Sequence, residues 1–130
     1  MVDYLKKEVN MEFDEAIEKV QEAAESEGFK VMMVKKMNQV FKKNLGIDYP
    51  KYAFILACKP EFAKKALDAS LNMGLLFPCS FVVYEEEGKM IVSHASIMKI
   101  GPEVGIAPQD KMDPVIKETG EAVHKIWDKI

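Results

Sequence analysis

Hydrophobic and polar residues follow two different periods along the first part of this chain. Residues 3–10 show the two-residue period of a strand, and residues 13–27 repeat apolar side chains at helical spacing. Gly28 then suits a left-handed helix end. Residues 29–34 are rich in strand-forming side chains, and residues 37–45 return to helical spacing. The pattern predicts a strand, a helix, a second strand and a short helix.

The middle of the chain contains the clearest strand signals. Residues 52–58 form a nearly continuous apolar run that is too short for a helix and predicts a central strand. A helix follows that begins at Pro60, a residue that fits a first helical turn, and ends near Asn72. Residues 79–86 and 89–96 alternate, and an acidic residue followed by glycine joins them. That arrangement predicts a hairpin.

A turn-rich connector follows Lys99, and the chain then becomes helical again. Asp113 can cap this last helix and Pro114 can occupy its first turn, before an apolar stripe that continues to Ile130. The stripe must be buried either on the chain's own sheet or against another subunit, and the pattern does not decide between them.

The predicted order is β-α-β-α-β-α-β-β-α, which indicates an α+β fold. We expect two layers: a mixed or largely antiparallel sheet of about five strands, with helices over it. We expect residues 1–130 to form a single domain.

Composition narrows the classes of function. The 130 residues are 48% hydrophobic and carry a formal net charge of −3, and every basic residue is Lys. Without Arg the chain lacks the planar guanidinium group that donates paired hydrogen bonds to guanine and phosphate, so we expect no nucleic-acid partner. The charged beginning of the chain and the lack of about 20 consecutive apolar residues predict no secretory signal and no membrane partner. We therefore expect a cytoplasmic protein with reduced cysteines.

Short motifs stand in a fixed order through the middle of the chain: Leu45-Gly46, Tyr49-Pro50, Ala57-Cys58-Lys59-Pro60, Gly74-Leu75-Leu76-Phe77-Pro78-Cys79, and Val82-Val83-Tyr84-Glu85 through Gly88. In these motifs, and over residues 13–96, the chain resembles the prokaryotic family catalogued as domain of unknown function 302. The resemblance implies a compact α+β domain, often dimeric, with no established activity. The chain departs from the family at Lys59, where Asn is common, and in its extension over residues 97–130.

Cys58 and Cys79 are the candidate catalytic residues. If their strands are antiparallel neighbours, both thiols lie at the same end of the sheet, and a helix beginning after Cys58 would favour its thiolate. We favour the other interpretation, in which both are small buried hydrophobic residues. A metal site would need further ligands, and His94 and His124 make no recognised motif, so we expect no metal and no cofactor.

A second group of residues offers polar contacts for a ligand. Asp48, Tyr49, Tyr52 and Tyr84 are placed to line a polar cleft beside the helix that begins at Pro60, although the tyrosines also fit ordinary packing at a sheet margin. We expect His94 to be a partly exposed strand residue and His124 to face solvent. The candidate ligand-binding residues are Asp48, Tyr52, Lys59, Pro60, Pro78, Tyr84 and His94.

Three hypotheses of function remain. The first is a homodimeric module without established catalysis that binds an unidentified small molecule or serves assembly, with residues 58–60 and 73–78 as pocket walls. The alternative is a small thiol-dependent redox or sulfur-handling enzyme that uses Cys58 or Cys79. The third is a purely structural assembly protein whose terminal helix holds subunits together. Whether the chain is an enzyme stays open at this point.

Overall fold

A five-stranded antiparallel sheet organises the protein, whose computed structural model describes residues 4–130. The strand order is β1-β5-β4-β3-β2, and every neighbouring pair in it is antiparallel. The strands are β1 (Tyr4–Val9), β2 (Lys30–Lys36), β3 (Tyr52–Cys58), β4 (Cys79–Glu86) and β5 (Lys89–Ala95). The first strand of the sequence therefore pairs with the last one.

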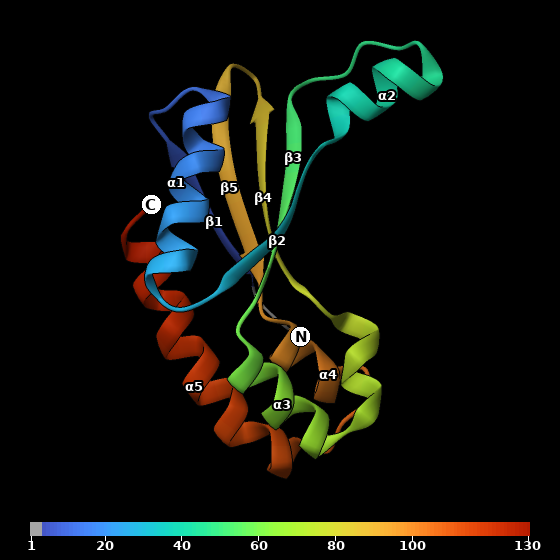
Figure 1. Cartoon of the computed structure of the whole chain (residues 1–130), viewed down its shortest axis with the longest axis vertical. Coiled ribbons are helices and arrows are strands. Elements are labelled where there is room, and N and C mark those ends of the chain that lie inside the picture. Colours follow the sequence, from blue (N-terminus) through green and yellow to red (C-terminus); the bar gives the residue numbers. More distant parts are fainter. Residues whose placement is uncertain (1–3) are drawn as a thin grey trace.

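Helices cover one face of this sheet and one of its ends (Figure 1). They are α1 (Phe13–Ser26), α2 (Met37–Leu45), α3 (Pro60–Ala69), the 3-10 helix η1 (Leu71–Leu76), α4 (Ile97–Glu103) and α5 (Gln109–Asp128). The helices α1 and α5 lie along one face, whereas α3, η1 and α4 gather at the end where β3 finishes. The helix α2 stands away from the rest of the molecule at the opposite end.

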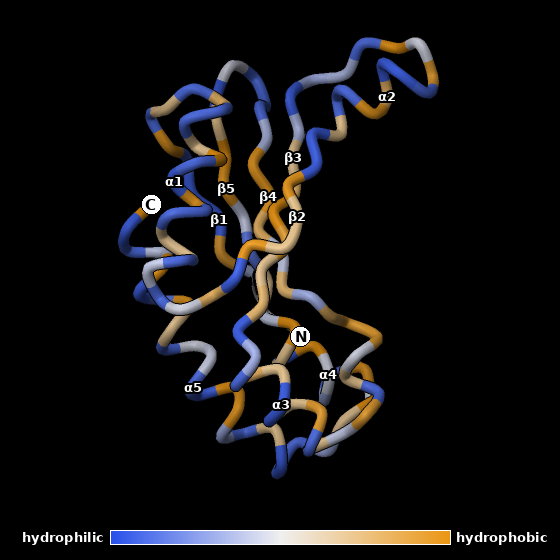
Figure 2. The backbone as a smooth tube through the Cα atoms, in the orientation of Figure 1, coloured by the Kyte–Doolittle hydropathy of each residue, from blue (hydrophilic) through white to orange (hydrophobic). Residues whose placement is uncertain are grey.

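The main core lies between the sheet and the helices α1 and α5. In β3 the side chains of Ala53, Ile55 and Ala57 are buried, while those between them are only half-buried. This alternation puts every second residue of a strand on the same face. Phe81 of β4 and Ile126 of α5 are buried in the same core. Figure 2 shows hydrophobic residues along the strands and along the inner sides of these helices.

A smaller second core joins the helices at the end of the sheet. Three methionines, Met73, Met98 and Met112, are buried there with Ala66, Ala107 and Val115. Unbranched methionine side chains fill irregular spaces of this kind. Gly101 of α4 is buried as well, and its backbone packs directly against Met73. Phe62 lies against both cores and connects them.

The sheet face opposite α1 and α5 is open. Among residues 4–130 no helix packs across it (Figure 1). The helix α2 has no buried residue, although it carries apolar side chains. We call residues 35–51, which contain the end of β2, α2 and the return to β3, the arm.

The α+β class and the predicted order of elements are confirmed. Asp3, the start of the first predicted strand, lies outside the described residues. The sheet is antiparallel throughout its described strands rather than mixed. The connector after Lys99 contains most of a helix, α4, that the turn residues concealed.

The last helix begins earlier than predicted. It starts at Gln109 after Pro108, so Pro114 lies inside it and not in its first turn. Its apolar stripe is buried in the chain's own core through Ala122 and Ile126. The stripe is therefore buried on the chain's own sheet, the first of the two alternatives that the sequence pattern left open.

Candidate functional site

The two cysteines line one cavity at the end of the sheet next to α3. Cys79 begins β4 directly opposite Ala57, and Cys58 is the next residue of β3. Both side chains are half-buried free thiols. The strands β3 and β4 are antiparallel neighbours, so the condition for both thiols to lie at the same end of the sheet is met.

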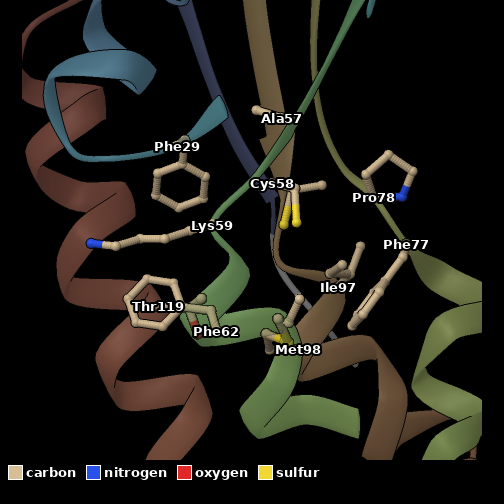
Figure 3. Close-up of a pocket in the computed structure, with 12 residues that line it drawn as sticks. Phe29, Ala57, Cys58, Lys59, Phe62, Phe77, Pro78, Ile97, Met98 and Thr119 are labelled. Atoms are coloured by element: carbon tan, nitrogen blue, oxygen red, sulfur yellow. The ribbon is translucent and has the colours of Figure 1, made fainter. Parts of the chain in front are cut away.

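The walls of this cavity are almost entirely apolar. They are built from Phe29, Phe62, Phe77, Ile97 and Met98, which come from four different segments of the chain (Figure 3). A water-sized sphere can occupy only about 20 Å³ of the cavity. That is room for about one water molecule. The cavity as it stands does not admit an organic substrate.

Lys59 and Pro78 also line the cavity, as predicted, but Lys59 does not point to the thiols. Its Nζ donates a hydrogen bond to the carbonyl oxygen of Glu27 at 3.1 Å and lies 5.0 Å from the centre of the Phe62 ring. Figure 3 shows this side chain extending away from Cys58. Lys59 therefore supplies no cation to stabilise a thiolate. Pro60 fills the first turn of α3 and is not part of the cavity wall.

Burial keeps Cys79 protonated. Loss of hydration raises the pKa of its thiol to about 11, and the neighbouring Cys58 adds to the shift. A buried thiolate without a cation is unfavourable, because the charged form loses its hydration. At neutral pH Cys79 is a neutral side chain, so Cys79 is not a ready nucleophile.

The predicted tyrosine cleft exists, but at the other end of the sheet. Tyr52 and Tyr84 stack with ring centres 5.8 Å apart, and with Tyr49 and the glutamates of the β4–β5 turn they line a shallow cleft. The cleft is not beside Pro60, because β3 runs between them. Asp48 lies outside it on the arm, where its exposed carboxylate pairs with Lys42 at 3.0 Å.

His94 is placed differently from our expectation. It is 5% exposed rather than partly exposed, because its side chain points to the helix-covered face of the sheet and stacks on Phe81 with ring centres 4.3 Å apart. His124 is exposed, as predicted, and yet both histidines line one pocket beside α5. The order of the strands brings them together, and no spacing in the sequence indicates it.

No three His, Cys, Asp or Glu side chains in residues 4–130 gather closely enough to hold a metal ion. None of the helices described here is long and apolar enough to span a bilayer.

Comparisons with known proteins give a family and a fold. A family model described as domain of unknown function DUF302 matches residues 5–130. The crystal structure of an uncharacterized conserved protein DUF302 from Bacillus stearothermophilus has a TM-score of 0.85 to this chain at 20% sequence identity, covering 97% of this chain and 96% of that one. This likeness shows a shared fold. No protein in the curated comparison matches.

Proposed function

Since this chain belongs to the DUF302 family, whose description names no activity, we propose its function from the geometry of its own surfaces. We propose a homodimeric module for assembly and ligand binding, without catalysis of its own. The single observation that supports this most strongly is the apolar sheet face that no helix of residues 4–130 covers.

The open face has the composition of an interface. Phe54 and Leu56 of β3 and Val82 of β4 lie on it, each alternating with a buried residue of the main core. Met33 on the neighbouring strand β2 is 49% exposed. A contiguous apolar surface of this kind on a sheet is typical of a site for protein association. Two such faces packed together would form a sheet-on-sheet core.

The arm adds a second surface that needs a partner. Its helix α2 has nine residues, none of them buried. A helix this short is only marginally stable in water unless it packs against something. Leu45 and Ile47 are also exposed, while Phe41 packs on Tyr49 of the same arm, with ring centres 4.8 Å apart. We infer that another molecule covers the arm.

Charge favours a second copy of this chain as that molecule. The arm contains five lysines and one aspartate, whereas the whole chain carries a net charge of −3. The end of β4 and the turn that follows it, at the same end of the molecule, contain three adjacent glutamates, Glu85, Glu86 and Glu87. A twofold arrangement that lays each arm across the partner's turn pairs these opposite charges twice.

The test is the mass of the protein in solution. We expect sedimentation equilibrium of the native chain to give twice the 14.7 kDa of one chain. The Leu56→Asp variant should give the mass of one chain, because the substitution places a charge in the centre of the apolar face. Leu71→Asp is the matched control, because Leu71 is 84% exposed but lies on η1. Circular dichroism checks that both variants fold.

A native chain that sediments as a monomer at about 100 µM would remove the proposal, since dimers of this size commonly form well below that concentration. The same holds if Leu56→Asp associates as the native chain does.

A second candidate function is thiol redox chemistry, and the shared cavity of Cys58 and Cys79 is the observation in its favour. In that reaction both thiols lose their protons and one Sγ–Sγ bond forms, while a small disulfide such as oxidised glutathione takes up two electrons and two protons. The high pKa of Cys79 opposes this reaction, because the attacking species is the thiolate.

Thiol labelling decides between the two candidates. We expect Cys79 to resist iodoacetamide on the native chain from pH 6 to 9, because a pKa of about 11 leaves only about 1% thiolate at pH 9. Denatured chain should label at both cysteines, which serves as the control. Peptide mass spectrometry identifies the labelled residue. Rapid labelling of Cys79 at pH 7, or conversion to a disulfide by oxidised glutathione within minutes, would place the redox function first.

A further inference from the structure

A second pocket, separate from the thiol cavity, lies between α5 and the strands β1 and β5. A water-sized sphere can occupy about 150 Å³ of it. A cavity of that volume holds a molecule of about six non-hydrogen atoms, the size of benzene. Thr119 stands between the two cavities and lines both of them. The pocket is therefore large enough for a small organic ligand, whereas the thiol cavity is not.

His94 presents a fixed hydrogen-bond acceptor to this pocket. Its Nδ1 lies 2.8 Å from the carbonyl oxygen of Ser80, which can only accept, so Nδ1 carries the hydrogen. Burial holds the pKa of His94 below its ordinary value, and the ring is neutral at pH 7. Nε2 then has a free lone pair, and no group among the described residues bonds to it. Stacking on Phe81 holds the ring in place.

The rim of the pocket is cationic and polar. Lys99 and His124 line it from α4 and α5, and Ser96 lines it at the start of α4. Ser96 accepts a hydrogen bond from the backbone N–H of Lys99 and keeps its own hydroxyl hydrogen available. No carboxylate of residues 4–130 lines the pocket. The rim therefore suits an anionic group, and the buried His94 suits a hydrogen-bond donor.

Gly120 keeps the pocket open from the side of α5. It lies in the middle of this helix, where glycine is less favourable than alanine. No backbone strain calls for glycine there, and a Cβ atom added at this position would meet no atom within 4 Å. The open space beside Gly120 belongs to the pocket that it lines. A larger side chain at this position would fill the pocket without disturbing the main core.

We propose that this pocket binds a small hydroxycarboxylate, with the ligand's hydroxyl donating to His94 Nε2 and its carboxylate held by Lys99 and His124. The site does not depend on the proposed dimer, because every residue that forms it belongs to one chain. The three elements of recognition are a buried neutral acceptor, a cationic rim and a volume that limits the ligand to about six non-hydrogen atoms.

L-lactate, which has six non-hydrogen atoms, is the probe. We expect it to shift the His94 imidazole nitrogen signals and the Gly120 amide signal of the ¹⁵N-labelled full chain to saturation in the millimolar range. Propionate lacks the hydroxyl and propane-1,2-diol lacks the charge, so each should bind at least about tenfold more weakly, because one polar group of the site stays unpaired.

Two variants, each with a matched control variant, locate the binding. Gly120→Leu fills the pocket and should abolish the lactate shifts, while Gly120→Ala should leave the thermal midpoint unchanged or raised, which shows that α5 tolerates a side chain there. Lys99→Gln should weaken lactate binding severalfold, and Lys111→Gln, an exposed lysine of α5 outside the pocket, should not. Absence of saturable shifts with lactate, equal binding of propionate, or unchanged binding by Gly120→Leu would each overturn the proposal.

Discussion

Truncating Phe81 to alanine is expected to lower the free energy of unfolding by about 3–5 kcal/mol. Phe81 is among the largest side chains with 0% exposure, and it lies on β4 at the centre of the sheet. It belongs to the main core beneath α1, and the His94 ring stacks on it. Removing the ring loses its hydrophobic burial and leaves a cavity that the rigid strands cannot close.

Urea denaturation at one fixed protein concentration measures this loss. Leu71→Ala is the control, because Leu71 is 84% exposed, and the change should cost less than about 0.5 kcal/mol. Similar losses in the two variants would mean that Phe81 does not occupy the core described here. The Phe81→Ala variant should also lose the lactate response, since the His94 ring would no longer be held in one orientation.

Gly101→Ala is expected to lower the free energy of unfolding by about 1–3 kcal/mol, although alanine normally stabilises a helix relative to glycine. A Cβ atom at this position in α4 would overlap the sulfur of Met73. Met73 is 0% exposed and belongs to the second core, so its side chain has little free space to move into. The close approach of α4 to η1 is what requires the glycine.

A double-mutant cycle tests that explanation. Met73→Ala removes the atoms that the new Cβ would meet, so the cost of Gly101→Ala should fall by at least about 1 kcal/mol in that background. Part of the loss in the free energy of unfolding is expected with or without Met73→Ala, because the Cβ atom of an alanine directly before Pro102 disfavours the helical conformation. If Gly101→Ala costs the same in both backgrounds, contact with Met73 is not the cause.

Two different patterns predicted the central strands. Residues 52–58 form a continuous apolar run that is too short for a helix, and residues 79–86 and 89–96 alternate. In β3 and β4 buried residues alternate with half-buried ones, whereas three consecutive residues of β5 are buried. The helix α4 was missed because Gly101 and Pro102 indicate a turn, whereas here the glycine allows close packing. Glycine and proline in a sequence indicate the backbone conformation of their own segment. They do not indicate which other helix will pack against that segment.

The candidate sites were harder to predict, because they depend on strand order. The thiol cavity depends on β3 and β4 being neighbours, and the spacing of Cys58 and Cys79 in the sequence does not by itself fix that relation. The tyrosine cleft was expected at the wrong end of the sheet, because Tyr52 begins β3 whereas Pro60 follows the other end of that strand. Placing Lys99, Gly120 and His124 around His94 requires the packing of α5 on the sheet, which no short motif records.

The pairing of β1 with β5 also has a consequence for how the chain folds. Tyr4 pairs with Ala95, and Lys7 Nζ donates hydrogen bonds to the carbonyl oxygens of Trp127 and Ile130 at 2.6 and 3.1 Å. A strand that is synthesised first must therefore wait for partners synthesised last, and such distant contacts slow folding. Until they form, β5 presents an unpaired apolar edge that another nascent chain can pair with. Emergence of the C-terminal segment from the ribosome is thus expected to limit both the folding rate and the period of risk from aggregation.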